Sequence, residues 1–419
     1  MHNFGKTGIG TRSNESAPIC ARSEGAPNHG VYLDSPVVSA LRQIEPFYRS
    51  GMFDSQDTPL FLRMGPLTRL QLMASHPPEG INLCPYYGKE VGQLPISGGG
   101  VVFYPFNSQS NMNAVTNRGV THVLTLHGES NKLASNRPAA RLYDYICVAG
   151  PLARDRYLES SIFTPADVDQ GRLVMMGDSF VQTLPWIRAA APGETGALLY
   201  CPTWEGYGNG PVNYSSVPRK RGFSLLPEIA KASDAQQIII KPHPYLGLLK
   251  PSLLWDFISG VRGLIGKGPT IKLALGDASL PLRLLCRTHL SGLDRIDEAE
   301  ENLVPIRLGL CDISGMEAVF LKQYVASMTL SPTAEFPPSV RKIYCKKALL
   351  PQSVREATVE RYLAEAQNID EQHRRLVFGW QTSDLSEMLP DTRRNWLINY
   401  AQSDPFWKRR PTIRGEAAL

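Results

Sequence analysis

The feature of this sequence that most constrains its fold is a regular alternation of short β-branched runs with longer helical patterns. The runs read as strands, at 59–64, 100–104, 120–126, 143–148, 172–176, 197–201, 237–241, 270–274, 305–311 and 323–328. Stretches with helical periodicity lie between them, at 36–49, 108–118, 151–160, 223–233, 248–265, 280–288 and 314–321. Strands that alternate with helices in this way predict crossover connections and parallel sheets covered by helices.

The number of strands predicts two domains, because one sheet holding them all would be large. The stretch 188–196 (RAAAPGETG) contains the Pro, Gly and small residues of a linker between two sheets. We therefore predict an α/β fold with two doubly wound parallel-sheet domains facing each other, at 36–190 and 191–350. A flexible arm at 1–35, rich in Gly, Ser, Asn and Pro, precedes them, and helical patterns at 353–367 and 368–380 dominate the final segment, 351–419.

Composition and charge exclude several classes of protein. Basic residues exceed acidic ones by only 44 − 39 = 5 in 419 residues, so we predict no nucleic-acid partner. No apolar run approaches the length of about 20 residues that a membrane-spanning helix needs, and the N-terminus lacks the apolar core of a secretory signal. Seven scattered cysteines without a C-x-x-C pair argue against disulfides and a Cys-rich zinc site. These features predict a soluble cytoplasmic protein.

The C-terminal segment concentrates the basic surplus. Residues 393–419 contain six basic and two acidic residues, together with Trp396, Tyr400, Phe406 and Trp407. One interpretation is peripheral contact of this basic tail with anionic lipid at the inner face of the cell membrane, because cations and tryptophans favour that interface. The other, which we favour, is that these helices pack across the space between the two domains and leave a few solvated arginines.

Polar residues follow four of the predicted strands, where ligands bind in open parallel sheets. The four exits read HGESNK (127–132), TWEGY (203–207), HP (243–244) and SG (314–315). Because they come from both predicted domains, we expect them to converge on one site.

His127 is the first candidate of this set. A histidine with a pKa near 6.5 is largely neutral at pH 7 and can accept a proton from an alcohol. The adjacent Gly128 would let a substrate approach the backbone closely, and Lys132 could neutralise a phosphate. The plainer interpretation is a packed loop histidine and a solvated lysine.

His243 is the second candidate, because it lies between Pro242 and Pro244. Prolines fix the backbone, so this imidazole would be held rigidly, as the stabilisation of a phosphate or leaving group requires. The alternative is a histidine packed at a stiff strand end.

The exits at 203 and 314 suggest phosphate binding. Ser314 and Gly315 offer a hydroxyl and backbone N–H groups at a helix start, a natural anion site, although Asp312 or Ser314 could equally be an ordinary N-cap. Glu317 could reach a ribose diol or complement the helix dipole. Thr203 could bind phosphate or end its strand.

The remaining acidic cluster and the common motifs indicate no other site. The run 294–301 (DRIDEAEE) has no histidine partners, so we predict a solvated helix face there and no metal site. No P-loop, HExxH or GxSxG pattern occurs.

Six stretches, in this order and spacing, give the chain a family resemblance. They are FYPFNSQSNMNAV (103–115), THVLTLHGESNK (121–132), YDYICVAGPLARDRYL (143–158), LLYCPTWEGY (198–207), IIIKPHP (238–244) and CDISGMEAVF (311–320). Together the stretches resemble the CDP-glycerol glycerophosphotransferases, the enzymes of teichoic-acid and capsule synthesis. The resemblance implies a GT-B architecture, with the nucleotide mainly on the second domain, the acceptor in the cleft and C-terminal helices packing back on the first domain.

The resemblance also implies roles for individual residues. His127 matches the base that deprotonates the acceptor, and His243 the group that holds the donor pyrophosphate. Thr203 and Ser314 match residues near the donor phosphates. The predicted donor-binding set is Gly128, Ser130, Lys132, Thr203, Ser314, Gly315 and Glu317. The sequence departs from the family at Gly315, where a hydroxyl is expected, at 176–179 (MGDS), and at Glu317, which has no secure counterpart.

The predicted function is transfer of a polyol phosphate, such as glycerol phosphate, from a CDP-activated donor to a hydroxyl of a cell-surface glycan or lipid-linked acceptor, with release of CMP. A divalent cation such as Mg²⁺ could assist, but no carboxylate cluster requires a cofactor. Two alternatives stay open at this point: a nucleotide-sugar glycosyltransferase of the same architecture, and a non-catalytic glycan-assembly subunit.

Overall fold

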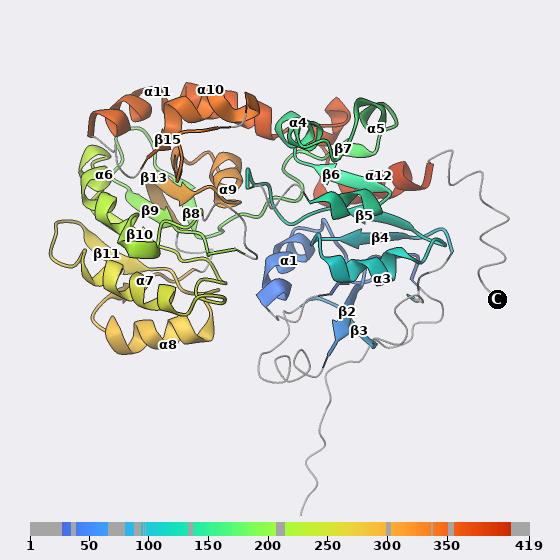
Figure 1. Cartoon of the computed structure of the whole chain (residues 1–419), viewed down its shortest axis with the longest axis horizontal. Helices are drawn as coiled ribbons and strands as arrows, with labels where there is room; N and C mark the ends of the chain where they lie inside the picture. The colour runs from blue at the N-terminus through green and yellow to red at the C-terminus, as the bar shows by residue number, and fades with distance from the viewer. Residues whose placement is uncertain are drawn as a thin grey trace, which may run out of the picture.

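Two parallel sheets, each in its own domain, organise the chain (Figure 1). The structure is a computed structural model that describes residues 27–34, 39–65, 80–87, 94, 96, 98–132, 137–206, 214–298, 303–336, 338–350 and 356–403.

The first sheet has the strand order β3-β2-β1-β4-β5-β6-β7, with every pair parallel. Its strands are β1 His29–Leu33, β2 Leu60–Met64, β3 Leu83–Tyr87, β4 Val101–Tyr104, β5 Thr121–Leu124, β6 Tyr145–Val148 and β7 Leu173–Met175. The helices that accompany them are α1 Ser39–Arg49, α3 Met112–Val115, α4 Pro151–Glu159 and α5 Pro165–Asp169, with η1 Gln109–Asn111 and η3 Pro138–Leu142 as single 3₁₀ turns.

The second sheet has the order β12-β11-β10-β9-β13-β14-β15, and β8 pairs with β13 beside this path. Its strands are β8 Ile187–Ala189, β9 Ala197–Cys201, β10 Gln237–Ile240, β11 Thr270–Leu273, β12 Asp294–Arg295, β13 Val304–Asp312, β14 Ser327–Leu330 and β15 Ala348–Leu349. Its helices are α6 Leu226–Ala232, α7 Ser252–Arg262, α8 Leu280–His289, α9 Met316–Lys322 and α10 Pro338–Lys347, with η4 Pro218–Lys220 and η5 Phe223–Leu225 before α6.

The central strands are buried on both faces, as doubly wound sheets require. In β9, Leu198 and Tyr200 point into one apolar core, while Leu199 and Cys201 point into another on the opposite face. The predicted fold class, two doubly wound parallel α/β domains in a GT-B-like arrangement with C-terminal helices, is confirmed.

Three expectations about local structure are wrong. Residues 29–33 lie in the range that we expected to be a loose arm, but they form β1 between β2 and β4 in the first sheet. Residues 188 and 189, the first two of the expected linker, belong to β8 (187–189) in the second sheet, so the connection between the domains comes earlier. The run from Asp294 is no helix, because it begins with β12 and continues as coil to residue 298.

The C-terminal helices connect the two domains. α11 Glu356–Val377 is one continuous helix where the sequence suggested two, and it packs Val359, Tyr362 and Ile369 into the core of the second domain. After η6 Ser383–Ser386, α12 Pro390–Ser403 places Leu397 and Ala401 in the core of the first domain. Figure 1 shows this return, with α12 in red beside the strands of the first sheet.

The membrane-contacting tail that the sequence suggested lies mostly outside the described residues, which end at 403. Within them, Trp396 and Tyr400 pack against the core of the first domain. No helix among the described residues combines the length and apolar character needed to cross a bilayer.

The register of the second sheet brings its strand exits to one edge. Tyr200 pairs with Ile240, and Cys201 pairs with Cys311 on the other side of β9. The residues that follow these three strands therefore leave the sheet at the same level, and they include Thr203, His243 and Ser314.

Candidate active site

A strained turn after β5 carries His127. Leu126, which is not a glycine, has a φ of 60°, in the left-handed region that costs an L-residue roughly 1–2 kcal/mol. Gly128 on the other side has a φ of 153°, a conformation that also favours glycine. Strain of this kind persists where the surrounding structure enforces it, and it is concentrated at functional sites.

The hydrogen bond of His127 fixes its tautomer. Its Nδ1 lies 2.8 Å from the carbonyl oxygen of Pro105, which can only accept, so Nδ1 carries the hydrogen. The ring stacks on Phe106, with centroids 4.1 Å apart. Burial lowers the pKa of His127 below its usual 6.5, although the bond to Pro105 opposes this. At pH 7 the imidazole is therefore neutral, and its Nε2 has a free lone pair.

His243 has the opposite tautomer. Its Nδ1 accepts the backbone N–H of Tyr245 at 3.1 Å, so the hydrogen of the neutral ring is on Nε2. Its own backbone N–H donates to the carbonyl oxygen of Pro202 at 3.2 Å, and its ring stacks on Trp204 with an angle of 17° between the planes. These contacts hold the imidazole as a hydrogen-bond donor.

The imidazole of His243 lies within electrostatic range of His127. Burial, together with the charges of Lys132, Lys241 and His127, lowers the pKa of His243 well below its usual range. Both rings are therefore neutral at pH 7, one with a basic Nε2 and the other with an Nε2–H. Such a pair can accept a proton from one group and donate a hydrogen bond to another.

Lys132 connects the loop of the first domain to the second domain. Its Nζ donates to Oγ1 of the buried Thr203 at 2.7 Å. Burial lowers the pKa of Lys132 to about 8, although the charge of Asp312 opposes this. Lys132 is therefore mostly protonated at pH 7, and it is a partly desolvated cation at the junction of the two domains.

Asp312 supports this junction from β13. Its Oδ2 accepts the backbone N–H groups of Thr203 at 2.7 Å and Ser216 at 3.1 Å. Oδ1 has no hydrogen-bond partner among the described residues. Burial raises the pKa of this carboxyl to about 6, although the hydrogen bonds and Lys132 oppose the shift. Asp312 thus fixes the backbone of Thr203 and supplies a negative charge near Lys132.

A second buried cation, Lys241, follows the end of β10, close to His243. The buried Lys241, two residues before His243, places its Nζ 2.7 Å from Asp277 and 3.5 Å from Glu298. Burial alone would lower the pKa of Lys241, but the two carboxylates raise it above its usual value. Glu298 belongs to the acidic run that we expected to be solvated, so this part of the run has an internal partner.

The remaining predicted residues shape the same loops. Ser130 Oγ accepts the backbone N–H of Lys132 at 3.2 Å, and Ser314 Oγ accepts that of Met316 at 3.4 Å. Gly315 is the N-cap of α9, without a side-chain cap, and its Cα lies close to the loop of the first domain, because an added Cβ would be 3.6 Å from the Glu129 carbonyl oxygen. Their proposed contacts with a donor stay predictions.

Both carboxylate oxygens of Glu317 accept hydrogen bonds from other residues of the protein. Its Oε1 accepts the hydroxyl of Thr329 at 2.9 Å, and its Oε2 accepts the hydroxyl of Tyr344 at 2.6 Å and the amide of Asn131 at 3.3 Å. The side chain is buried. This arrangement makes Glu317 a point of contact between the domains, and its binding of a ribose stays a prediction.

Asn131 belongs to a polar network that crosses the domain boundary. Its Nδ2 also donates to the Tyr344 hydroxyl at 2.9 Å, and its Oδ1 accepts from Arg156 at 2.8 Å. Arg156 in turn forms a buried ion pair with Glu129. We call Glu129, Asn131, Arg156, Glu317 and Tyr344 the interdomain network. It holds the loop that carries His127 against the second domain.

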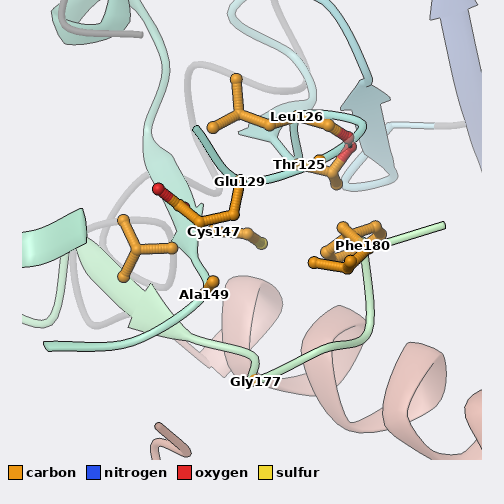
Figure 2. Close-up of a pocket in the computed structure, with 10 residues that line it drawn as sticks. Thr125, Leu126, Glu129, Cys147, Ala149, Gly177 and Phe180 are labelled. Atoms are coloured by element: carbon orange, nitrogen blue, oxygen red, sulfur yellow. Dashed lines mark hydrogen bonds between the residues drawn. The ribbon is translucent and has the colours of Figure 1, made fainter. Parts of the chain in front are cut away.

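A small hollow lies beneath this loop, at the carboxyl ends of β5 and β6 (Figure 2). Thr125, Leu126 and Glu129 line one part of it, and Cys147 and Phe180 line another. Its inner volume is about 10 Å³, which is room for about one water molecule. The hollow is too small for a nucleotide. The candidate site is the junction of Lys132, Thr203 and the two histidines, where Lys132 binds Thr203 and both Lys132 and His127 lie within electrostatic range of His243.

No group of three or more His, Cys, Asp or Glu side chains in the described ranges is placed to hold a metal ion. The assisting divalent cation therefore stays a prediction, and the proposed reaction does not include it.

Sequence reasoning missed Arg156, Tyr344 and Trp204. Arg156 lies inside α4 and Tyr344 inside α10, where nothing in the local pattern distinguishes them from other helical residues. Trp204 was part of a recognised strand exit, but its stacking on His243 depends on the pairing of β9 with β10.

Comparisons with known proteins add a likeness of fold. No protein-family model matches the chain. No curated protein matches it either. Among solved structures, a putative UDP-N-acetylglucosamine 2-epimerase from Listeria monocytogenes is 10% identical, with 90% of this chain and 96% of that chain covered and a TM-score of 0.48.

Two other structures are similar to the same degree. A trehalose-6-phosphate protein from E. coli bound with UDP-2-fluoro glucose is 9% identical over 90% of this chain and 99% of its own, with a TM-score of 0.44. The glycotransferase of kitacinnamycin is 11% identical over 90% and 99%, with a TM-score of 0.43. At this level the likeness concerns the fold alone, and the two-domain architecture stands on the strand order and the return of α12.

Proposed function

We propose that this chain is a transferase that moves a polyol phosphate from a CDP-activated donor to a hydroxyl of a glycan or lipid-linked acceptor and releases CMP. The observation that carries the proposal is the pair of neutral imidazoles with opposite tautomers, His127 and His243. The family resemblance of the strand exits supplies the class of donor.

The proposed reaction is one in-line displacement at phosphorus. The acceptor oxygen forms a bond to the β-phosphorus of the donor, and the bond from that phosphorus to the bridging oxygen breaks, so that CMP leaves with the bonding electrons. His127 Nε2 takes the proton of the acceptor hydroxyl, a contribution of roughly 10²–10⁴ in rate. His243 Nε2–H donates a hydrogen bond to a phosphate oxygen as negative charge develops on CMP.

In the proposed reaction, Lys132 supplies the positive charge that binds a donor phosphate. A donor phosphate would replace the Thr203 hydroxyl as the partner of Nζ, and the Thr203 hydroxyl would then be free to donate to the same phosphate. Positioning and electrostatic stabilisation account for most of the catalysis of phosphoryl transfer, because little covalent chemistry is needed.

Glu317 does not distinguish a CDP-polyol from a nucleotide sugar, because both donors contain a ribose. Both of its carboxylate oxygens already accept hydrogen bonds from the protein, so the choice between the two donors is left to the donor screen.

A screen of nucleotide donors tests the proposal. The purified chain is offered CDP-glycerol, CDP-ribitol, UDP-glucose, UDP-N-acetylglucosamine and GDP-mannose with a glycan acceptor mixture, and the released nucleotide is measured. We expect CMP release from a CDP-polyol. UDP or GDP release in its place would establish the glycosyltransferase alternative, and tight donor binding without any nucleotide release would indicate a binding subunit.

The lowered pKa of Lys132 gives a prediction for donor binding. Above pH 8 the lysine loses its proton and hence its attraction for phosphate, so we expect the Kd of CDP to rise with pH, by at most about tenfold per pH unit. In the K132R variant, arginine keeps its charge, and the Kd should stay level to pH 9 or higher. Calorimetric titration with CDP between pH 7 and pH 9.5 measures both. Identical pH dependence in the wild type and K132R would show that Lys132 does not contact the phosphates.

A further inference from the structure

Many of the exposed large apolar side chains among the described residues lie in one segment of the second domain. Twelve large hydrophobic side chains are exposed in the described residues, and half of them lie between residues 248 and 284. They are Leu248, Leu249, Trp255, Ile265, Leu280 and Leu284. Trp255 and Leu284 are each 53% exposed, and Leu280 is 60% exposed. Such clustering marks an interaction site, whereas single exposed apolar residues are ordinary.

The exposed charged residues of the same segment have one sign. Every exposed charged residue from 244 to 293 is basic, and the set is Lys250, Arg262, Lys267, Arg283 and Arg287. The two carboxylates in this range, Asp256 and Asp277, are only partly exposed and are occupied, because Asp256 accepts the backbone N–H of Arg219 and Asp277 pairs with Lys241. The region therefore favours an anionic partner.

These residues lie on two adjacent helices, α7 and α8, and on the loops before and after α7. Trp255 of α7 and His289 of α8 have ring centroids 5.1 Å apart, and Arg262 donates to the His289 carbonyl. The inner faces of the two helices are buried in the core of the second domain. Figure 1 shows α7 and α8 side by side at the margin of that domain. We call this exposed face the α7–α8 surface.

The loop before α7 is held in place by a carboxylate. Glu205 accepts the backbone N–H groups of Gly247 at 3.1 Å, Leu249 at 2.8 Å and Lys250 at 2.9 Å. Leu248 and Leu249 are therefore presented on a fixed backbone, a few residues after His243. The α7–α8 surface thus begins beside the candidate site.

We propose that the α7–α8 surface docks on a membrane that contains anionic lipid. Tryptophan and leucine side chains on amphipathic helices enter the headgroup region, and the cations between them pair with lipid phosphates. Docking in this orientation brings the strand exits next to the bilayer, where a lipid-linked acceptor would be within reach. The inference goes beyond the proposed transfer reaction, and its test requires no turnover.

Vesicle sedimentation tests the proposal with the full chain. The probes are vesicles of phosphatidylglycerol and phosphatidylcholine in equal parts, and vesicles of phosphatidylcholine alone, in about 0.1 M salt. We expect wild-type protein to bind the anionic vesicles and to detach as salt rises. The W255E/L284E variant should bind about tenfold more weakly, because it replaces two apolar contacts with two anions. The matched control, L389E, changes a leucine that is 70% exposed before α12, and it should bind as the wild type does.

Three results would overturn the proposal. The first is absence of binding by the wild type. The second is normal binding by W255E/L284E with lost binding in a K408E/R409E/R410E variant, which would assign docking to the tail. The third is a wild-type dimer that W255E/L284E converts to a monomer in sedimentation velocity, which would make a second copy of the chain the occupant.

A fluorescence measurement keeps the proposal testable if W255E/L284E misfolds. Brominated lipids quench tryptophans that reach the acyl chains, so we expect quenching in the wild type and a clear reduction in W255F. Equal quenching in both would contradict insertion of Trp255.

Discussion

Replacing His127 with asparagine is expected to lower the rate of CMP release from a CDP-polyol by about 10²–10⁴. An asparagine amide can still donate from the δ position to the carbonyl oxygen of Pro105, as Nδ1 does now at 2.8 Å. The variant therefore keeps the anchor of the side chain and removes only the basic Nε2. Single-turnover measurement of released CMP reports the loss on the chemical step.

Two further variants, H127A and H243N, distinguish loss of the base from loss of donor binding. H127A removes the anchor as well, so its rate should be no higher than that of H127N, and CDP should bind both with nearly the wild-type Kd. H243N can still accept the Tyr245 N–H but lacks the Nε2–H, so it should lower the rate and also weaken CDP binding. Wild-type turnover in H127N would exclude His127 as the base.

Replacing Arg156 with methionine is expected to lower the free energy of unfolding by about 3–5 kcal/mol. The side chains of Arg156 and Glu129 are 9% and 7% exposed, so the substitution leaves Glu129 as a buried charge without its cation. Urea denaturation followed by circular dichroism measures the change. The double variant R156M/E129Q removes both charges and should recover most of the lost stability.

The control for this effect is a pair at the surface. Arg375 is 77% exposed in its ion pair with Glu371, and R375M should unfold at the wild-type urea concentration. Equal denaturation midpoints for R156M and R375M would contradict the importance of the interdomain network. Because Arg156 also holds Asn131, R156M should reduce turnover even at temperatures where it stays folded.

The strands of both sheets were largely predictable, because buried parallel strands are continuous β-branched runs that local sequence displays. β14 shows the limit of this reasoning. We expected a strand at 323–328, but Tyr324 has a φ of 58° and ends the preceding turn, so the strand runs from Ser327 to Leu330. β1 was missed since HGVYL is short and follows a polar segment, and only its pairing with β2 and β4 makes it a strand.

The candidate site was predictable to the extent that it lies at strand exits. Parallel pairing alone brings Thr203, His243 and Ser314 to one edge. The tautomers were not predictable, since they depend on the Pro105 carbonyl and the Tyr245 N–H, whose positions follow from loop geometry. The partners of the interdomain network depend on how two domains pack, and no local pattern encodes that.

The side-chain nitrogens of the two histidines show directly whether His127 can act as a base and His243 as a hydrogen-bond donor. Nitrogen-15 NMR of histidine-labelled protein at pH 7, assigned with H127N and H243N, identifies which nitrogen of each ring carries hydrogen. We predict Nδ1–H for His127 and Nε2–H for His243, both neutral, and changes in both signals when CDP is added. The same tautomer in both rings, or CDP binding that leaves both signals unchanged, would contradict the proposed roles of His127 and His243.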